Sequence, residues 1–257
     1  MIKCLSNRWE QGHRTSTYPK ETILLPERYR GKPVINNNCD QKIIDQCARN
    51  CPQEAIDPDH CTIDLGRCVF CGTCERLSQG QFIQFTNDFE FAFTQKKDCI
   101  TNGSIPDLNQ HVNLPAQKLF GKSLQLRQVS AGGCNACEAD TNVLNTPFFD
   151  LSRFGIQFVA SPRHADGLLI TGPVTRNMRT ALLQTYEAIP SPKIVIAVGS
   201  CALSGGPFRG SPDICDDLND LMKVDLLVPG CPPHPLTILY ALLGVIGGGS
   251  SQPIVIH

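Results

Sequence analysis

The stretch Ile194-Val-Ile-Ala-Val-Gly-Ser-Cys201-Ala-Leu-Ser-Gly-Gly206 decides the fold of this chain. It opens with a short apolar run, 194–198, that has the length of a buried strand, and a Gly-Ser turn then leads into a cysteine. Two other apolar runs end in the same way, namely Leu124–Val129 before Gly-Gly-Cys134-Asn-Ala-Cys137 and Asp225–Val228 before Pro-Gly-Cys231. Each predicted strand therefore delivers a thiol to the turn at its carboxyl end.

Apolar runs and helical segments alternate throughout residues 123–257. Further strands are expected at Ile156–Val159 and Leu168–Thr171, and helices near 138–146, 175–188, 213–222 and 235–246. Alternating strands and helices are typical of a parallel sheet covered by helices on both faces. We therefore predict the α/β class, with a doubly wound, flavodoxin-like parallel sheet in this part of the chain. Such sheets bind their ligands beyond the carboxyl ends of the strands.

Four cysteines are expected to meet at that edge: Cys134, Cys137, Cys201 and Cys231, here called the C-terminal quartet. Four thiolates are the ligand set of a 4Fe–4S cluster. A zinc ion also accepts four thiolates, but structural zinc sites mostly use two close cysteine pairs, and only one pair is close here. Alternatively, Cys201 and Cys231 are buried apolar residues, although both directly follow Ser or Gly in a turn. We predict a 4Fe–4S cluster at this site.

Residues 1–100 carry a denser group of cysteines, and we predict an α+β, ferredoxin-like iron–sulfur domain there. Strands are expected at 81–85 and 89–93, where apolar and polar residues alternate. The run Cys68-x2-Cys71-x2-Cys74 matches the first three ligands of a bacterial ferredoxin motif. Ser78 stands where the fourth cysteine would be. This motif is therefore one ligand short.

A second ferredoxin motif is damaged in a complementary way. Cys47-x3-Cys51-Pro52 is the end of such a motif, but Gln41 and Ile44 replace its first two cysteines. In ferredoxins with two clusters, the fourth cysteine of each motif ligates the other cluster. We therefore expect Cys51 to complete a 4Fe–4S site with Cys68, Cys71 and Cys74, here called the N-terminal quartet. The opposite site keeps Cys47 alone. Cys39 stands two residues too far upstream, and it would rescue this site only if another ligand also replaced Ser78.

Composition restricts the remaining classes. The chain has 257 residues, a net charge of -1 and 14 cysteines, and this charge gives no reason to expect nucleic acid as a partner. Disulfide-rich secreted scaffolds are usually shorter and follow a signal peptide, for which the first residues offer no apolar core. The longest apolar stretch, 236–246, is shorter than the roughly 20 residues that span a bilayer. We predict a cytoplasmic protein, with 101–122 as a linker and docking segment.

Five ordered motifs carry a family resemblance over residues 115–257. They are Gly-Gly-Cys-Asn-Ala-Cys-Glu, Ser-Pro-Arg-His-Ala-Asp, Thr-Gly-Pro-Val-Thr-Arg-Asn-Met, Gly-Ser-Cys-Ala-Leu-Ser-Gly-Gly and Val-Pro-Gly-Cys-Pro-Pro. This half resembles the small subunit of group 4, membrane-bound nickel–iron hydrogenases such as formate hydrogenlyase, and also the complex I subunit that carries the terminal cluster. The complex I subunit has two adjacent cysteines, whereas Cys134 and Cys137 are separated as in the hydrogenases.

A second resemblance covers residues 10–100. Arg14-Thr-Ser-Thr-Tyr-Pro, Arg30-Gly-Lys-Pro and Asp64-Leu-Gly-Arg-Cys-Val-Phe-Cys-Gly-Thr-Cys-Glu resemble the two-cluster ferredoxin-type subunit of formate hydrogenlyase and complex I. In those complexes the ferredoxin-type subunit neighbours the small subunit. The chain thus resembles a fusion of two adjacent electron carriers, of which one has lost a cluster.

These resemblances imply a non-catalytic electron-transfer subunit of an oxidoreductase complex, with two 4Fe–4S clusters and no catalytic residue of its own. The implied partners are a hydrogenase-type large subunit, an electron-donor iron–sulfur protein and integral membrane subunits of the same complex. The implied location is peripheral, on the cytoplasmic face of the inner membrane. Two alternatives remain: a complex I-type or hydrogenase-related oxidoreductase that lacks nickel, and a zinc-binding structural or redox-sensing protein.

Other polar residues near the quartets invite functional interpretations. Glu138 is expected to begin a helix beneath the C-terminal cluster, where a carboxylate favours the helix dipole. Arg163 and His164 are expected at the ligand edge of the sheet, where they would tune a potential or relay protons. His60 and His234 either hydrogen-bond cluster sulfurs or face solvent as turn residues. The remaining thiols lack ligand spacing and are taken as ordinary cysteines: Cys4, Cys61, Cys99 and Cys215.

Overall fold

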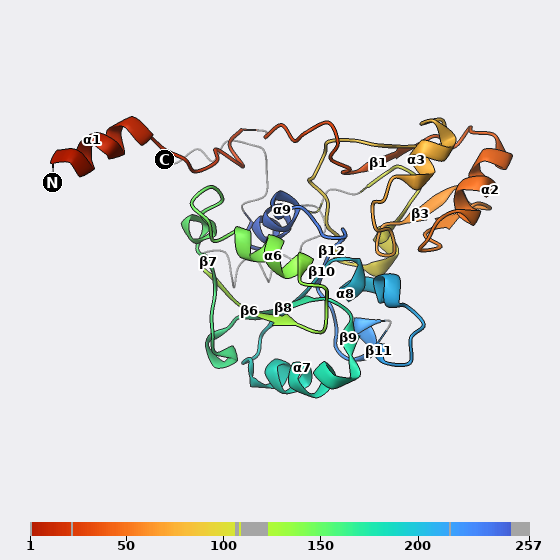
Figure 1. Ribbon diagram of the computed structural model, residues 1–257. Coiled ribbons are helices and arrows are strands. Elements are labelled where there is room, and N and C mark those ends of the chain that lie inside the picture. Colours follow the sequence, from red (N-terminus) through yellow and green to blue (C-terminus); the bar gives the residue numbers. More distant parts are fainter. Residues whose placement is uncertain (1, 22, 106–107, 109–122, 216, 248–257) are drawn as a thin grey trace.

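The order of elements changes near the middle of the chain, from short antiparallel pieces to alternating strands and helices (Figure 1). The computed structural model describes residues 2–21, 23–105, 108, 123–215 and 217–247. The α-helices are α1 Ile2–Gln11, α2 Gln41–Arg49, α3 Thr73–Ser78, α6 Ala136–Val143, α7 Arg176–Ala188, α8 Ser200–Ser204 and α9 Pro235–Val245. The 3-10 turns are η1 Lys96–Cys99, η2 Leu151–Phe154, η3 Pro162–His164, η4 Gly206–Phe208 and η5 Leu218–Asp220.

The strands form one parallel sheet and several small antiparallel pairs. The parallel strands are β6 Leu124–Ser130, β7 Ile156–Phe158, β8 Gly167–Thr171, β10 Ile194–Val198 and β12 Leu226–Val228. The short strands are β1 Pro33–Ile35, β2 Ile56–Asp57, β3 Thr62–Asp64, β4 Ile83–Phe85, β5 Ile100–Thr101, β9 Val174–Thr175 and β11 Ile214–Cys215.

The parallel sheet has the order β7-β6-β8-β10-β12. This order is that of flavodoxin-like sheets, in which the chain adds one strand on one side of the first and then continues on the other side. The predicted fold class of the C-terminal half is therefore confirmed. The strand order reverses between β6 and β8, and the turns after β6, β10 and β12 open at the same edge.

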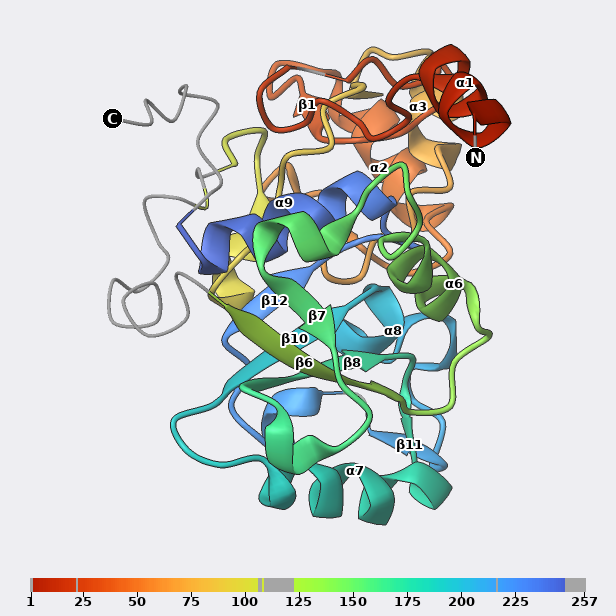
Figure 2. The ribbon, with the colours of Figure 1, turned by 90° about the vertical axis from the view of Figure 1, so that its left-hand side faces the viewer.

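Alternating side chains of the central strands reach two different layers. Ile194, Ile196 and Val198 pack into the core that contains α9, whereas Val195 and Ala197 pack into the core that contains Leu182 of α7. Because both faces are covered, every residue of β10 is apolar and buried, as expected for a parallel strand. Figures 1 and 2 show α6 and α9 on one side of the sheet and α7 on the other.

The helix predicted near 213–222 is wrong. Residues 214–215 instead form β11, which pairs with β9, and residues 218–220 form only the 3-10 turn η5. The side chain of Asp217 accepts a hydrogen bond from the backbone N–H of Asn219 and caps this turn. Asp and Asn favour such local turns over helix interiors because their side chains compete for backbone groups. The other predicted helices and strands of residues 123–257 are present within a few residues.

The N-terminal half contains two small antiparallel sheets, β1-β4 and β2-β3-β5, together with α2 and α3. The strand predicted at 81–85 is β4, but 89–93 does not form the expected strand. Phe89, Phe91 and Phe93 are all buried, and the segment makes a single antiparallel bridge, from Phe93 to Leu227 on the edge strand β12. Both sides of the segment are thus covered, which the alternating pattern does not reveal.

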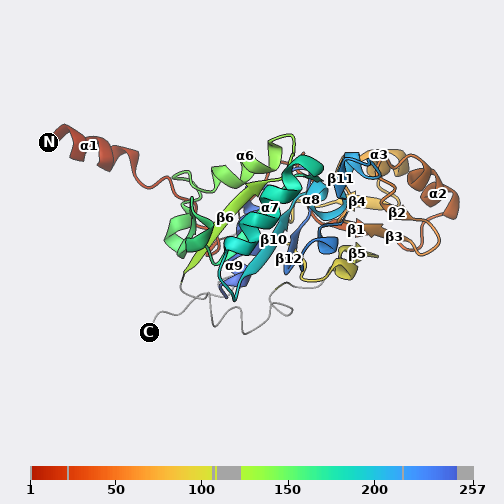
Figure 3. The same ribbon diagram turned by 90° about the horizontal axis from the view of Figure 1, so that it is seen from below.

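The two halves share one core. Apolar residues of the N-terminal half, such as Ile44 and Phe91, belong to the same buried cluster as Val195 and Leu203. Seen from below, the N-terminal elements α2 and α3 lie beyond β12, at one end of the parallel sheet (Figure 3). The segment before α2 is also held to the C-terminal half: the carbonyl oxygens of Ser16 and Tyr18 accept hydrogen bonds from Arg153, at 2.7 and 2.8 Å.

The segment predicted as a linker and docking segment, 101–122, lies mostly outside the described residues. Of its residues, 101–105 and Leu108 are described, and the Leu108 side chain is buried in the core beside α9. Among the described helices, none is long and apolar enough to span a bilayer.

Candidate metal centres

The C-terminal quartet lies on three turns at the carboxyl edge of the parallel sheet. Cys134 precedes α6 and Cys137 lies in its first turn, Cys201 lies in the first turn of α8, and Cys231 follows β12. Cys134 and Cys231 are exposed, whereas Cys137 and Cys201 are partly buried. The quartet thus has a buried side against the protein and an open side against solvent.

The electrostatics of these thiols indicate that the four lie close to one another. Burial raises the pKa of Cys201 to about 11, and the nearby thiols of Cys231 and Cys134 add to the shift. Burial likewise raises the pKa of Cys137, with further contributions from Cys201, Glu138, Cys231 and Cys134. Thiolates so close together oppose one another's ionisation, and a cationic metal core at their centre would remove that cost.

Two glycines leave room for thiols of this quartet. Gly199 has φ +91°, and a Cβ built on it would lie 2.5 Å from the Sγ of Cys137. Gly206 has φ +54°, and its Cβ would lie 2.8 Å from the Sγ of Cys201. Both contacts are far inside van der Waals range, so the two thiols occupy space that only a missing side chain provides.

The N-terminal quartet is also brought together. Cys51, Cys68, Cys71 and Cys74 line a single pocket, which Ile56, Ile63 and Phe85 close with apolar side chains. The backbone N–H of Ala55 donates to the Sγ of Cys51 and that of Phe70 to the Sγ of Cys68, both at 3.3 Å. Burial raises the pKa of Cys74 to about 12, and the thiols of Cys47, Cys71 and Cys51 raise it further.

Most residues at the positions of the damaged motif are buried. Ile44 and Cys47 are each only 1% exposed and lie in the shared core. Ser78 is also buried, and its hydroxyl donates to the carbonyl oxygen of Glu75 at 3.4 Å. Gln41 turns away and bonds to Asp45 and to the carbonyl oxygen of Pro58. Apolar packing therefore replaces ligand positions here.

Cys39 lies near the lost site without completing it. The pKa of Cys39 is raised, mainly by burial, and the charges of Asp40 and of the nearby Cys61 thiol raise it further. Its neighbour Cys47 points instead to the carbonyl oxygen of Cys74, at 3.5 Å. Among the described residues, no group of three or more His, Cys, Asp or Glu side chains is placed to hold a single metal ion.

Two observations at both quartets fit a 4Fe–4S cluster. Each quartet supplies four sulfur donors from more than one turn, and each has partly or fully buried thiols with a raised pKa. At the N-terminal quartet, two peptide N–H groups also point at two of the sulfurs. Hydrogen bonds of this kind stabilise thiolate sulfur and raise cluster potentials. The ligand assignment itself stays a prediction.

Glu138 lies in the first turn of α6, two residues after the helix begins, and its surroundings are specific. Its carboxylate is 6% exposed and accepts hydrogen bonds from the hydroxyls of Ser130, at 2.6 Å, and Thr171, at 2.8 Å. These donors lie at the carboxyl ends of β6 and β8. Sequence reasoning missed both hydroxyls, although each is a polar residue that ends an apolar strand next to the quartet. Together they fix the carboxylate beside Cys137.

The expectation that Arg163 and His164 lie at the ligand edge is wrong. Strand β7 is short and Phe158 is level with Leu126, which is in turn level with Gly167 at the start of β8. The turn η3 that carries both residues therefore lies at the amino end of β8, away from the cysteines. Both side chains are exposed.

The two histidines of interest differ in their surroundings. His60 is exposed, and its Nδ1 bonds to Asp57 at 2.8 Å, so it faces solvent as a turn residue. His234 lines a pocket together with Cys231, and its Nδ1 accepts the backbone N–H of Leu236 at 3.1 Å as the N-cap of α9. Burial lowers the pKa of His234. The His234 ring therefore acts as a hydrogen-bond acceptor that caps the N-terminus of α9.

Comparison with known proteins places residues 134–245 in the family described as NADH ubiquinone oxidoreductase, 20 Kd subunit. The chain is 44% identical over 126 residues to the probable membrane-bound hydrogenase subunit mbhJ of Pyrococcus furiosus, and the match covers 49% of this chain and 75% of that protein. It is 42% identical over 130 residues to formate hydrogenlyase subunit 7 of Escherichia coli, covering 51% of each. The chain thus spans about half the length of the latter relative.

A relative from the complex I group is similar to the same extent. An NADH-quinone oxidoreductase subunit of Carboxydothermus hydrogenoformans is 42% identical over 142 residues, covering 49% of this chain and 86% of that protein. The matched family region contains the complete C-terminal quartet. The chain therefore belongs to the family of the NADH ubiquinone oxidoreductase 20 Kd subunit, which it shares with subunits of membrane-bound hydrogenases.

Proposed function

We propose that this chain is an electron-transfer subunit that relays electrons through two 4Fe–4S clusters to the catalytic large subunit of a group 4 nickel–iron hydrogenase-like, formate hydrogenlyase-like membrane complex. The observation that carries the proposal is the convergence of two separate cysteine quartets within one packed unit. Cys51, Cys68, Cys71 and Cys74 would hold one cluster, and the C-terminal quartet the other. A bound cluster supplies reversible one-electron transfer at each site.

The residues of the chain would supply three conditions for this role. The turns that carry the C-terminal quartet are fixed on a buried parallel sheet, so the sulfur positions change little between redox states. Ile56, Ile63 and Phe85 exclude water from one side of the N-terminal quartet. The N–H groups of Ala55 and Phe70 offset negative charge on the sulfurs.

The exposed thiols indicate where partners would dock. Cys134 and Cys231 are exposed at the sheet edge, and Cys71 is exposed at the N-terminal quartet. We propose that the large subunit covers the former pair and that an electron-donor iron–sulfur protein approaches the latter. Integral membrane subunits would hold the complex, with this chain peripheral on the cytoplasmic face of the inner membrane. In the same proposal, 1–100 is the ferredoxin-like domain and 123–257 the small-subunit-like domain.

The separation of Cys134 from Cys137 favours a hydrogenase-type partner over a complex I-type one, because the resemblance associates adjacent cysteines with complex I. A hydrogenase-related complex whose large subunit lacks nickel shares this spacing. The sequence of that large subunit separates the two, since nickel binding requires paired cysteine motifs. Capture of a large subunit with integral membrane proteins from detergent extracts tests the partners, and recovery of the chain as a monomer under gentle anaerobic conditions would contradict them.

Iron analysis and visible absorption of the anaerobically purified chain test the proposal. We expect about eight irons per chain, four for each quartet, and a brown colour that dithionite bleaches. About four irons would leave one quartet empty, and about twelve would show that the damaged motif still binds a cluster. A colourless protein that contains zinc would instead support a structural or redox-sensing role.

A further inference from the structure

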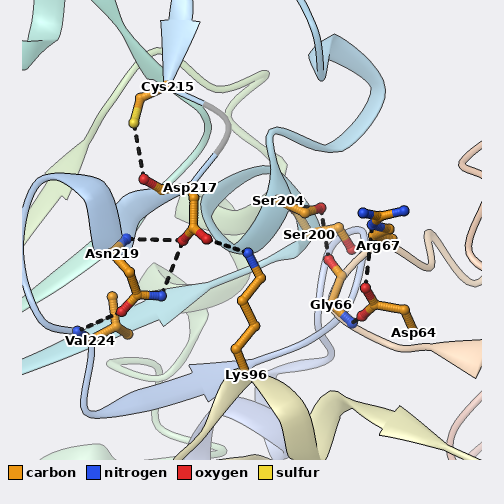
Figure 4. Close-up of polar contacts among 10 residues, drawn as sticks. All are labelled: Asp64, Gly66, Arg67, Lys96, Ser200, Ser204, Cys215, Asp217, Asn219 and Val224. Atoms are coloured by element: carbon orange, nitrogen blue, oxygen red, sulfur yellow. Dashed lines mark hydrogen bonds and ion pairs between the residues drawn. The ribbon is translucent and has the colours of Figure 1, made fainter.

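Ser200 lies at the junction of the two quartets. It directly precedes Cys201, and its hydroxyl donates to the carbonyl oxygen of Cys68 at 2.7 Å, although the two residues are 132 positions apart in the chain. Its side chain is 1% exposed. Figure 4 shows Ser200 and Ser204 of α8 facing the turn at Gly66, with Ser204 bonded to the carbonyl oxygen of Gly66. The Ser200 side chain therefore connects the backbone of Cys68, in the N-terminal quartet, to the turn that carries Cys201, in the C-terminal quartet.

The hydroxyl proton of Ser200 has two acceptors within reach. The second is the carbonyl oxygen of Gly230, at 3.1 Å. That oxygen already accepts the backbone N–H of Ser200 at 2.8 Å, whereas the hydroxyl comes closest to the oxygen of Cys68. A serine hydroxyl has a single proton to donate, and the shorter contact favours Cys68. The bond between the two ligand-bearing turns is thus the preferred one.

A second route between the quartets crosses open space. Val69 and Phe70 of the N-terminal half and Cys231 of the C-terminal quartet line one pocket, in which Arg28 and Arg30 also lie. An electron that crosses there must pass through a gap between atoms that are not bonded. The route by Ser200 stays within covalent bonds except for one short hydrogen bond, and both partners of that bond, Ser200 and Cys68, are buried.

We propose that Ser200 is the electronic bridge between the two clusters, with Cys68 as its point of entry and Cys201 as its point of exit. This inference rests on the proposed function, because it requires both quartets to hold a cluster. With both clusters bound, the cluster held by the N-terminal quartet would lose one electron and be oxidised, and the cluster held by the C-terminal quartet would gain that electron and be reduced. No bond is made or broken and no proton moves. A low-potential one-electron reductant supplies the electron.

The test compares two serines of the same short helix. Ser200→Ala removes the hydrogen bond between the quartets. Ser204→Ala removes buried bonds to the carbonyl oxygens of Gly66 and Ser200, neither of which belongs to a ligand, and it leaves the Ser200 hydroxyl in place. Both variants of the full chain are loaded anaerobically, reduced with a light pulse in the presence of a photoreductant, and frozen at intervals for EPR. We expect electron exchange between the clusters to slow several-fold in Ser200→Ala and to stay unchanged in Ser204→Ala.

Further measurements separate an electronic role from a structural one. The magnetic interaction between the two reduced clusters reports their separation, and we expect it to be the same in the wild-type chain and in Ser200→Ala. Ser200→Thr, which keeps the hydroxyl, should restore the exchange rate. If Ser200→Ala does not fold, Ser200→Cys replaces it, because a thiol is a weaker donor and should give an intermediate rate.

Three outcomes would overturn the bridge. These are an unchanged exchange rate in Ser200→Ala with the magnetic interaction intact, equal slowing in Ser204→Ala, and a wild-type rate in Ser200→Cys. Failure of the proposed function itself looks different, since the wild-type chain would then lack a second cluster signal and about half of the expected iron.

Discussion

Replacing Cys51 by Ala tests the exchange of ligands between the two ferredoxin motifs. Cys51 belongs to the damaged motif by sequence, yet it lines the pocket of Cys68, Cys71 and Cys74. We therefore expect Cys51→Ala to lower the iron content from about eight per chain to about four if the cluster is lost, or to about seven if a three-iron cluster remains. Iron analysis with EPR distinguishes the two results.

The same change has a calculable cost in the apo chain. The backbone N–H of Ala55 donates to the Sγ of Cys51 at 3.3 Å, and Ala55 is 3% exposed. Leaving a buried donor without an acceptor costs about 1–3 kcal/mol. Urea unfolding of the apo chain should therefore show a loss of this size in Cys51→Ala.

Cys47→Ala is the matched control. Cys47 is in the same motif and 1% exposed, so its removal should cost about 1 kcal/mol, the value for one buried group of methylene size. It should leave the iron content at about eight per chain, as should Cys39→Ala. Equal loss of iron in Cys51→Ala and Cys39→Ala would refute the exchange of ligands and would show that the damaged motif still binds metal.

Three further changes have defined outcomes. Ile44→Ala should lower the free energy of unfolding by about 2–5 kcal/mol in urea titrations, because it opens a cavity at the lost ligand position, and should release no iron. The pKa of Asp217 is lowered: burial raises it, but the hydrogen bonds from Lys96 and Asn219 and the charge of Lys96 together outweigh burial. The stabilisation by this pair is thus complete above the ordinary pKa of 3.8 and is lost as the pH falls through the lower folded pKa. Lys96→Met should therefore lose more stability at pH 7 than at pH 3. Lys223→Met, which removes a more exposed ion pair, should lose less stability than Lys96→Met. Cys231→Ala should abolish turnover of the assembled complex while EPR still shows a reducible N-terminal cluster, and persistent turnover without the second cluster would mean that electrons take another route.

Local signals in the sequence are sufficient to predict the parallel sheet and the convergence of both quartets. Each cysteine of the C-terminal quartet follows its own strand or begins the helix after it, so the fold alone brings the four together. Ferredoxin spacing places Cys51 beside the cysteines of the other motif, and the structure has it in their pocket. In these cases the relevant information lies within a few residues of each ligand.

The helix expected near 213–222 fails for a local reason, the turn capped by Asp217, but the other wrong predictions depend on information that is not local. The place of Arg163 and His164 follows from the register of a short strand, β7, which its neighbours determine. The segment 89–93 alternates like a surface strand, yet the other half of the chain covers it. The contact between Ser200 and Cys68 joins two motifs whose own sequences give no sign of it.

Under the proposed function, the packing around Ile44 limits how many electrons the N-terminal half would hold at one time. A ferredoxin with two clusters can accept two electrons from one donor encounter, since each 4Fe–4S cluster takes one. Here apolar side chains occupy the second position, so under the proposed function this half is a single-electron port. A donor that releases electrons in pairs must therefore wait for the first to move on to the sheet edge. Electrons would thus enter this half one at a time, and the rate of electron transfer between the two quartets would limit how fast any donor can be oxidised.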